Sequence, residues 1–285
     1  MGYLLLKRIL FVLIVFTGLM IFSNSCMQMR TSTKATNTRF SEKYITCTIT
    51  NTLIDNNEIR LVKTQGDNTT KAILFIHGAP GSSNAFYYYL EDKQLLKQAS
   101  LYSVDRCGYG YSEFGSSISS IEQQAKLLSQ LIDSCIFEKE IIVVGHSFGG
   151  PIAAYLSTLN TRITKLVMLA PANDPTHEKI FWISYFARWK LTKWMIPKTF
   201  QVAGDEKFAH QQALEEIEEI WSKIEIETVH FHGKKDALVP FENLQFTKER
   251  MNPTVFKEVI FDEENHFIPW TQQKTITLEL LRLLE

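Results

Sequence analysis

Short apolar segments recur along the chain from about residue 45, each bounded by glycine, proline or small polar residues. Their β-branched and aromatic content predicts strands at 45–50, 58–64, 72–76, 101–104, 141–144, 166–170, 228–231 and 256–260. The last six are apolar enough to be buried on both faces, as strands of a parallel sheet are. Between them, apolar positions recur at helical spacing, as in 121–136 and 151–159. This alternation predicts a doubly wound α/β domain.

One connection is far longer than the others. Residues 171–227 separate the sixth and seventh predicted strands, whereas a single crossover needs only about a dozen residues. Within this insertion, 179–197 is rich in aromatic residues interleaved with Lys and Arg, and 211–224 has the pattern of an acidic amphipathic helix. We expect most of these aromatic side chains to pack inside the protein and a few to line a pocket. A membrane-contacting face is the alternative.

The N-terminal residues have a different pattern. Lys7 and Arg8 precede an apolar run over 9–22, and small or polar residues follow it as far as Cys26. This order predicts a secretory signal peptide over 1–25. The small Ser25 directly before Cys26 is typical of bacterial lipoproteins, so we expect Cys26 to become the lipid-carrying first residue of an exported protein attached to a cell-envelope membrane. Secretion without lipid and an uncleaved N-terminal anchor are the alternatives.

The residues after Cys26 contain little to bury. Residues 26–43 are rich in Thr, Ser, Asn, Lys and Arg, which predicts a polar tether. The folded domain is therefore expected to begin near Tyr44 and to span 44–285.

Composition and charge narrow the range of partners. The 30 Lys and Arg residues nearly balance 31 Asp and Glu residues, for a net charge of −1, so the overall charge gives no attraction to nucleic acid. The four cysteines show neither metal-ligand spacing nor a CxxC pair. We expect no metal and no cofactor, and the oligomeric state stays open.

Reactive side chains follow several of the predicted strands. The segment IIVVGHSFGG places Ser147 in a Gly-x-Ser-x-Gly pattern directly after a strand, where a sharp strand-to-helix turn holds a serine hydroxyl outward. In an open parallel sheet the carboxyl ends of the strands meet at one edge, and reactive groups gather there. We expect four further segments at that edge, namely HGAPGSS at 77–83, DRCGYGYS at 105–112, HGKKDALVP at 232–240 and FDEENHFIPW at 261–270.

With these motifs in this order, nearly all of 44–285 resembles the α/β-hydrolase superfamily, in its serine-nucleophile, esterase- and lipase-like branch. The resemblance implies a mostly parallel eight-stranded sheet with a helical cap at about 172–226, inserted after the sixth strand. It also implies a catalytic triad in the chain order Ser, acid, His, which selects Ser147, Asp236 and His266. The oxyanion hole would take its two backbone N–H groups from Ala79 and Phe148.

Other residues compete for some of these roles. Asp174 is the alternative acid, because some members of this fold place the acid after the sixth strand. Histidines at 77, 146, 230 and 232 lie in or beside strand ends, where packing or the fixing of a loop explains them as well as catalysis does. We expect Asp105 to brace the turn that follows its strand, and Arg106 to be a solvated or loop-bracing cation.

The resemblance implies cleavage of a carboxylic ester or similar acyl bond in a small-molecule substrate, which the aromatic-rich cap suggests carries an apolar group. HGAPG is similar to the HGGPG loop of proline iminopeptidases, but GHSFGG departs from their GGSWG turn, so a proline-iminopeptidase-like aminopeptidase or amidase is an alternative. A catalytically silent binding protein on the same fold, or a structural lipoprotein of the envelope, is another.

Overall fold

The computed structural model describes residues 27–67, 70–179 and 193–285, together with single positions within 7–18 and at 185 and 189. The predicted signal peptide over 1–25 falls mostly outside the described residues, and Cys26 falls wholly outside them. Among the residues that are described, no helix combines the length and the apolar character needed to cross a membrane.

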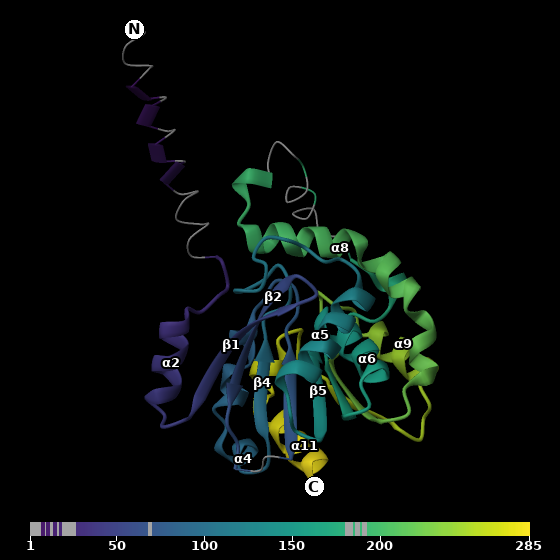
Figure 1. Ribbon diagram of the computed structural model, residues 1–285. Coiled ribbons are helices and arrows are strands. Elements are labelled where there is room, and N and C mark those ends of the chain that lie inside the picture. Colours follow the sequence, from purple (N-terminus) through teal and green to yellow (C-terminus); the bar gives the residue numbers. More distant parts are fainter. Residues whose placement is uncertain are drawn as a thin grey trace.

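The described residues form one eight-stranded sheet at the centre of the molecule, in the order β1-β2-β4-β3-β5-β6-β7-β8 (Figure 1). The strands β1 and β2 pair antiparallel, as do β2 and β4, and all later pairs are parallel. The predicted fold class is confirmed. The strands are β1 (Cys47–Ile54), β2 (Asn57–Thr64), β3 (Lys71–Ile76), β4 (Ser100–Val104), β5 (Glu140–His146), β6 (Ile163–Leu169), β7 (Glu227–Gly233) and β8 (Phe256–Phe261).

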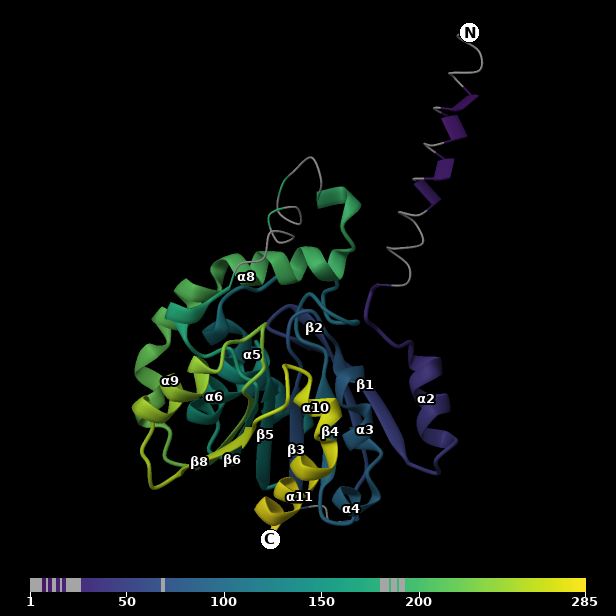
Figure 2. The ribbon, with the colours of Figure 1, turned by 180° about the vertical axis from the view of Figure 1, so that it is seen from behind.

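Both faces of the sheet are covered, as Figures 1 and 2 show from opposite sides. Along β3, Leu74 and Ile76 belong to one buried apolar cluster, and Ile73 and Phe75 belong to the other. A strand with apolar residues on both faces needs a helical layer on each side. The first cluster takes in α5 (Ile121–Cys135), α6 (Gly149–Leu159) and α9 (Glu242–Arg250), and the second takes in η1 (Ser83–Phe86), α3 (Tyr87–Leu90), α4 (Lys93–Leu96), α10 (Ile268–Thr271) and α11 (Gln273–Leu284).

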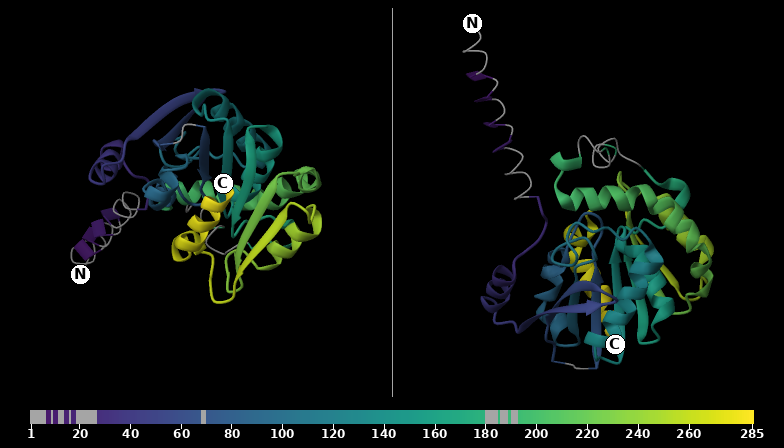
Figure 3. Two further views of the ribbon diagram at one scale, coloured as in Figure 1. Left: turned by 90° about the horizontal axis from the view of Figure 1, so that it is seen from below. Right: turned by 45° about the horizontal axis from the view of Figure 1, so that its top comes forward.

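The segment between β6 and β7 is helical where it is described. It contains η2 (Pro175–His177), η3 (Lys193–Met195), α8 (Lys198–Glu216) and η4 (Glu218–Lys223). Helix α8 crosses above the carboxyl ends of the central strands (Figures 1 and 3). The helix expected over 211–224 is thus divided, because α8 ends at Glu216 and η4 follows. The apolar residues Ile220 and Trp221 of η4 are buried in the first apolar cluster.

Residues 26–43, expected to be a polar tether, instead contain the helix α2 (Thr33–Ser41). Thr36 and Phe40, one turn apart, are fully buried, and the Phe40 ring lies 5.2 Å from that of Tyr87. Arg39 makes a bidentate contact with Glu91. Two buried positions in a polar helix give too weak a pattern to predict packing, which explains the difference.

The residues before α2 also contact the domain. Thr31 accepts a hydrogen bond at its carbonyl oxygen from Arg60 Nη1, 2.9 Å away, and Thr199 in α8 donates to the carbonyl oxygen of Gln28 at 3.0 Å. The guanidinium of Arg30 lies 4.9 Å from the ring centroid of Tyr111. The chain from Gln28 onward therefore follows the surface of the domain and touches both the sheet and the cap.

Candidate active site

Ser147 lies at a sharp turn between β5 and α6. Its φ is +54°, in the left-handed region that residues other than glycine rarely adopt. A Cβ atom on Gly145 would lie 2.3 Å from the carbonyl oxygen of Gly149, and one on Gly149 would lie 2.5 Å from the carbonyl oxygen of Ile76. The strand, the helix and β3 approach so closely that only glycine fits at these two positions. The turn carries Ser147 to the carboxyl edge of the sheet, as the sequence pattern predicts.

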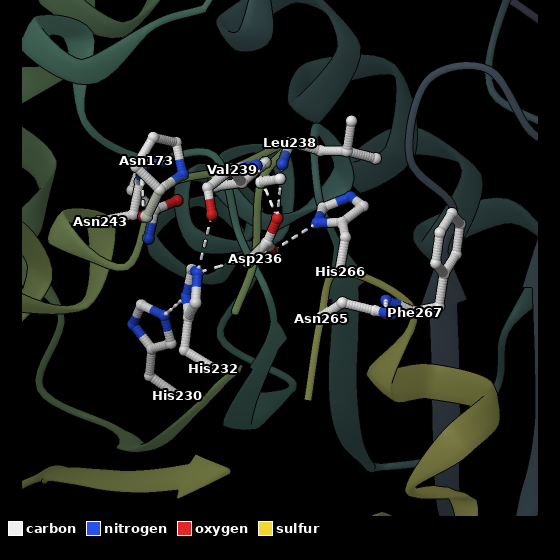
Figure 4. Close-up of polar contacts among 12 residues, drawn as sticks. Asn173, His230, His232, Asp236, Leu238, Val239, Asn243, Asn265, His266 and Phe267 are labelled. Atoms are coloured by element: carbon white, nitrogen blue, oxygen red, sulfur yellow. Dashed lines mark hydrogen bonds and ion pairs between the residues drawn. The ribbon is translucent and has the colours of Figure 1, made fainter. Parts of the chain in front are cut away.

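Asp236 and His266 follow β7 and β8 and point toward one another (Figure 4). Their Oδ2 and Nδ1 atoms are 2.7 Å apart. The other carboxylate oxygen, Oδ1, accepts hydrogen bonds from the backbone N–H groups of Leu238 at 2.9 Å and Val239 at 2.8 Å. Both side chains are nearly buried, which strengthens a charge-assisted hydrogen bond. The arrangement fixes Nδ1 of His266 as the nitrogen that faces the acid.

His266 is also held on the side of the serine turn. His146 lies directly before Ser147, and its Nε2 is 3.2 Å from the carbonyl oxygen of His266. The two imidazole rings are 4.8 Å apart between centroids. Among the described residues, the Ser147 hydroxyl makes no hydrogen bond to His266. Hydrogen bonds of this kind commonly tighten only when a substrate is bound.

The loop after β3 lies against the serine. A Cβ atom on Gly78 would be 2.8 Å from the Cβ of Ser147, so the loop backbone touches the side chain that is predicted to react. Nothing in the described part of the chain accepts a hydrogen bond from the backbone N–H of Ala79 or of Phe148. Buried or half-buried N–H groups are normally paired, so two such groups beside Ser147 are free to bind a ligand oxygen.

Asp174, the alternative acid, is engaged elsewhere. Its Oδ1 accepts hydrogen bonds from the backbone N–H and the hydroxyl of Thr176, and its Oδ2 lies 2.6 Å from Nδ1 of His177. These contacts make it the N-cap of η2. The structure brings Asp236, and not Asp174, into contact with His266.

The two charged residues after β4 are both buried. Asp105 accepts hydrogen bonds from the backbone N–H groups of Ser83 at 2.7 Å and Tyr111 at 2.9 Å, so it braces the turn as expected. Arg106 is 1% exposed, and it contacts the loop after β3 as well as Glu206 in α8. Of the two roles expected for Arg106, a solvated or a loop-bracing cation, the structure shows the loop-bracing one, and nothing in the sequence indicated its partner in the cap.

A pair of histidines extends inward from the acid. Nε2 of His230 lies 3.1 Å from Nδ1 of His232, whose own Nε2 lies 3.1 Å from the carbonyl oxygen of Val239 (Figure 4). Because a carbonyl only accepts, His232 carries its proton on Nε2 and receives a hydrogen bond from His230. His232 thereby fixes the backbone at Val239, one of the two donors that hold Asp236.

Four buried histidines surround the site without carrying charge. Burial lowers the pKa of His230 and of His232, and it holds the pKa of His146 well below the usual range with a further contribution from His266. Burial and the neighbouring Arg106 guanidinium do the same for the pKa of His77. These histidines therefore stay neutral in the folded protein at neutral pH. Among the described residues, no group of three or more His, Cys, Asp or Glu side chains is placed to hold a metal ion.

This burial predicts acid sensitivity. Below about pH 6.5 the unfolded chain binds protons at these histidines and the folded protein does not, so the free energy of unfolding falls as pH decreases, by up to about 1.4 kcal/mol per pH unit for each histidine. Urea unfolding at pH 7, 6 and 5 measures this slope. His230→Leu should reduce this slope by the contribution of one histidine, whereas the control Phe137→Leu, an exposed substitution that changes no titratable group, should not. An unchanged slope in His230→Leu would contradict the interpretation.

Comparisons with known proteins agree with this geometry. A family model described as the alpha/beta hydrolase fold matches residues 71–205. Among solved structures, the chain is similar to an esterase from Exiguobacterium antarcticum, with 19% identity and a TM-score of 0.65 over 83% of this chain and 98% of the other. It is similar to a serine hydrolase from Cycloclasticus zankles, with 14% identity and a TM-score of 0.65 over 83% of this chain and 97% of the other.

A membrane phospholipase A, described as a bacterial virulence factor, matches with 16% identity and a TM-score of 0.60 over 99% of both chains. A comparison with curated protein sequences finds no match. At these identities the structural likeness shows the fold, and the family model adds the sequence pattern from β3 to the first part of the cap. The chain has the α/β-hydrolase fold, and its residues 71–205 match the family model of that fold.

Proposed function

We propose that the protein is a serine hydrolase that cleaves carboxylic esters, with Ser147 as nucleophile, His266 as general base and Asp236 as the acid. The observation that carries this proposal is the 2.7 Å contact between Asp236 and His266, which lies at the same sheet edge as the strained turn of Ser147. A serine hydroxyl becomes a useful nucleophile only when a base takes its proton, and the base works best when a carboxylate fixes its tautomer.

The reaction would proceed in two halves. Nε2 of His266 takes the proton from Ser147 as Oγ attacks the acyl carbon, and the same nitrogen then returns that proton to the departing alkoxide, which leaves as the alcohol. A water molecule next gives a proton to Nε2 of His266 and attacks the acyl carbon. His266 then returns that proton to Oγ of Ser147 as the acyl–oxygen bond breaks, which releases the carboxylic acid and restores the serine and the neutral imidazole. Asp236 stabilises the imidazolium in both halves without itself taking a proton.

Negative charge would develop on the acyl oxygen in each half. The two unpaired N–H groups of Ala79 and Phe148 are available to receive it, which supports their assignment as the oxyanion hole. Losing one such donor typically costs on the order of 3 kcal/mol of transition-state stabilisation.

Apolar side chains border the triad and indicate the substrate class. Leu238 follows Asp236 and is 40% exposed, and Phe267 and Trp270 follow His266 and are 50% and 39% exposed. The rings of Phe267 and Trp270 are 5.9 Å apart between centroids. Such a border favours esters with an apolar acyl or alkyl chain. The similarity to a phospholipase and to esterases is consistent with that class.

Substitution of the triad should show that its members act together. We expect Ser147→Ala and His266→Ala each to reduce kcat for a p-nitrophenyl ester by about 10⁴-fold or more, and the double variant to be little worse, because either loss removes the same activated nucleophile. A fluorophosphonate probe should label the unsubstituted protein at Ser147 only. Additive losses, or a labelled Ser147→Ala variant, would contradict the assignment.

The two candidate acids offer a matched control. Asp236→Asn should reduce kcat by several orders of magnitude, because the amide favours the wrong tautomer of His266. Asp174→Asn removes an equal charge beside a different histidine and should have little effect. A folded protein with neither turnover nor labelling would favour the catalytically silent alternative.

Chain-length preference tests the proposed substrate class. For a series of p-nitrophenyl esters, kcat/KM should rise with each added methylene, by up to about 0.8 kcal/mol or a factor of three to four, until the pocket is full. Phe267→Ala should flatten this rise. The control Phe137→Ala alters a 79% exposed ring just before β5, at the opposite edge of the sheet, and should leave the profile unchanged. Equal profiles in all three proteins would argue against an apolar site at Phe267.

We also propose that Cys26 carries lipid and attaches the enzyme to a cell-envelope membrane. The order of basic, apolar and small residues before Cys26 supports this, as does the similarity of the whole chain to a membrane phospholipase. Intact-mass measurement of the protein from its native host should show acyl mass that disappears in Cys26→Ser. An unmodified or uncleaved N-terminus would refute it.

A further inference from the structure

Arg106 binds the loop that leads to Ala79. Its Nε donates to the carbonyl oxygen of His77 at 2.9 Å, and its Nη2 donates to that of Gly78 at 3.1 Å. The two successive carbonyls directly precede Ala79, so the guanidinium fixes the peptide groups that orient the Ala79 N–H. Arg106 also approaches the Phe148 ring, with its Cζ 4.9 Å from the centroid.

Arg106 is held in turn by the cap. Glu206 in α8 makes a bidentate contact with it, at 2.6 Å between Oε1 and Nη1 and at 3.1 Å between Oε2 and Nη2. Tyr109 donates to Glu206 at 2.6 Å, and Gln124 bridges the pair by accepting from Arg106 at 2.8 Å and donating to Glu206 at 3.0 Å. Glu206 is fully buried, so this pair has no water to replace a lost partner.

A second contact reaches Phe148 from the next turn of α8. His210, four residues after Glu206, stacks on the Phe148 ring with 4.4 Å between centroids and 27° between planes. Nδ1 of His210 lies 2.8 Å from a carboxylate oxygen of Glu178, and Lys207 contacts the same carboxylate. The Phe148 side chain is thus in contact with both Arg106 and His210.

We propose that helix α8 positions the oxyanion hole through this α8 clamp, defined as the Glu206–Arg106 pair and the His210–Phe148 stack. The clamp contacts the two carbonyls that precede Ala79 and the ring of Phe148, and its members act as positioning residues that do not touch the substrate. The inference rests on the proposed function, because the proposed function assigns the oxyanion hole to Ala79 and Phe148. It adds that the cap, besides enclosing a substrate, sets the catalytic geometry.

The physical reason is the precision that such a hole requires. Ala79 lies in a loop and Phe148 at a turn, and donors must stay within a fraction of an ångström of the position that the oxyanion will occupy. Two side chains one turn apart on a helix move as a rigid unit. A displacement of α8 would therefore disturb both donors at once.

The test must separate positioning from simple support of the fold. Glu206→Gln alone leaves a buried charge unpaired and can prevent folding, so the main variant is Arg106→Met with Glu206→Met, which removes both charges together. His210→Ala removes the stack and His210→Phe restores it. Glu215→Gln is the control, because it neutralises an exposed carboxylate on the same helix. Circular dichroism and urea unfolding identify the folded variants.

If the proposal holds, the folded double variant and His210→Ala lose kcat by about tenfold to a hundredfold with KM changed less than about twofold, because only charge stabilisation in the transition state is reduced. A boronic acid inhibitor, whose tetrahedral oxygen mimics the oxyanion, should lose affinity by a similar factor. His210→Phe should recover most of the activity, and Glu215→Gln should match the unsubstituted protein. Folded variants with normal kcat and normal inhibitor affinity would overturn the proposal.

Hydrogen exchange gives a readout that does not depend on activity. Backbone amides in 77–81 should exchange at least tenfold faster in the double variant than in Glu215→Gln, and unchanged exchange would also overturn the proposal. Failure of the proposed function is seen separately, as an unsubstituted protein that the fluorophosphonate does not label. In that case the exchange rates still decide whether α8 holds this loop.

Discussion

The close approach of β5, α6 and β3 around Ser147 is the constraint on which the site depends. A Cβ atom on Gly145 would lie 2.3 Å from the carbonyl oxygen of Gly149, so the strand and the helix are in direct backbone contact there. The left-handed φ of Ser147 is maintained by packing on both sides rather than by its own preference. The side chain of Ser147 thus stands where the backbones of β5, α6 and β3 are in contact, and the histidine and the carboxylate follow later strands.

Polar groups at this edge are buried under the cap, and burial decides their charge states. Arg106 keeps its charge because Glu206 supplies an equal and opposite one at bidentate distance. His230 and His232 form a chain of neutral donors and acceptors that ends on the carbonyl of Val239. Beneath α8 the charge of Arg106 is therefore balanced by that of Glu206, and the pair of histidines adds none.

Sequence patterns predict those features of the protein that only a few residue types can form. Every predicted strand is present, because β-branched and aromatic runs between turn residues suit strands. Burial was predicted less well, since β8, at the edge of the sheet, is only partly buried although burial on both faces was expected. The pairing of Asp236 with His266 follows from the resemblance to α/β-hydrolases, which implies the chain order Ser, acid, His. Helix α2 was missed because its buried face is only Thr36 and Phe40 in a polar segment. Glu206 was missed because a single carboxylate in an acidic helix looks like a solvated one until the tertiary structure buries it.

The contacts made by residues 28–40 place the start of the folded domain earlier than Tyr44. A shortened protein that starts at Tyr44, where the polar composition ends, would lose the Phe40 ring from its buried place beside Tyr87. It would also deprive the buried Arg60 guanidinium of the Thr31 carbonyl and leave α8 without its hydrogen bond to Gln28. The smallest piece that keeps every one of these contacts starts at about Gln28. Any lipid on Cys26 would then be attached only two residues before the first of these contacts, so it would leave little chain between the membrane and the enzyme.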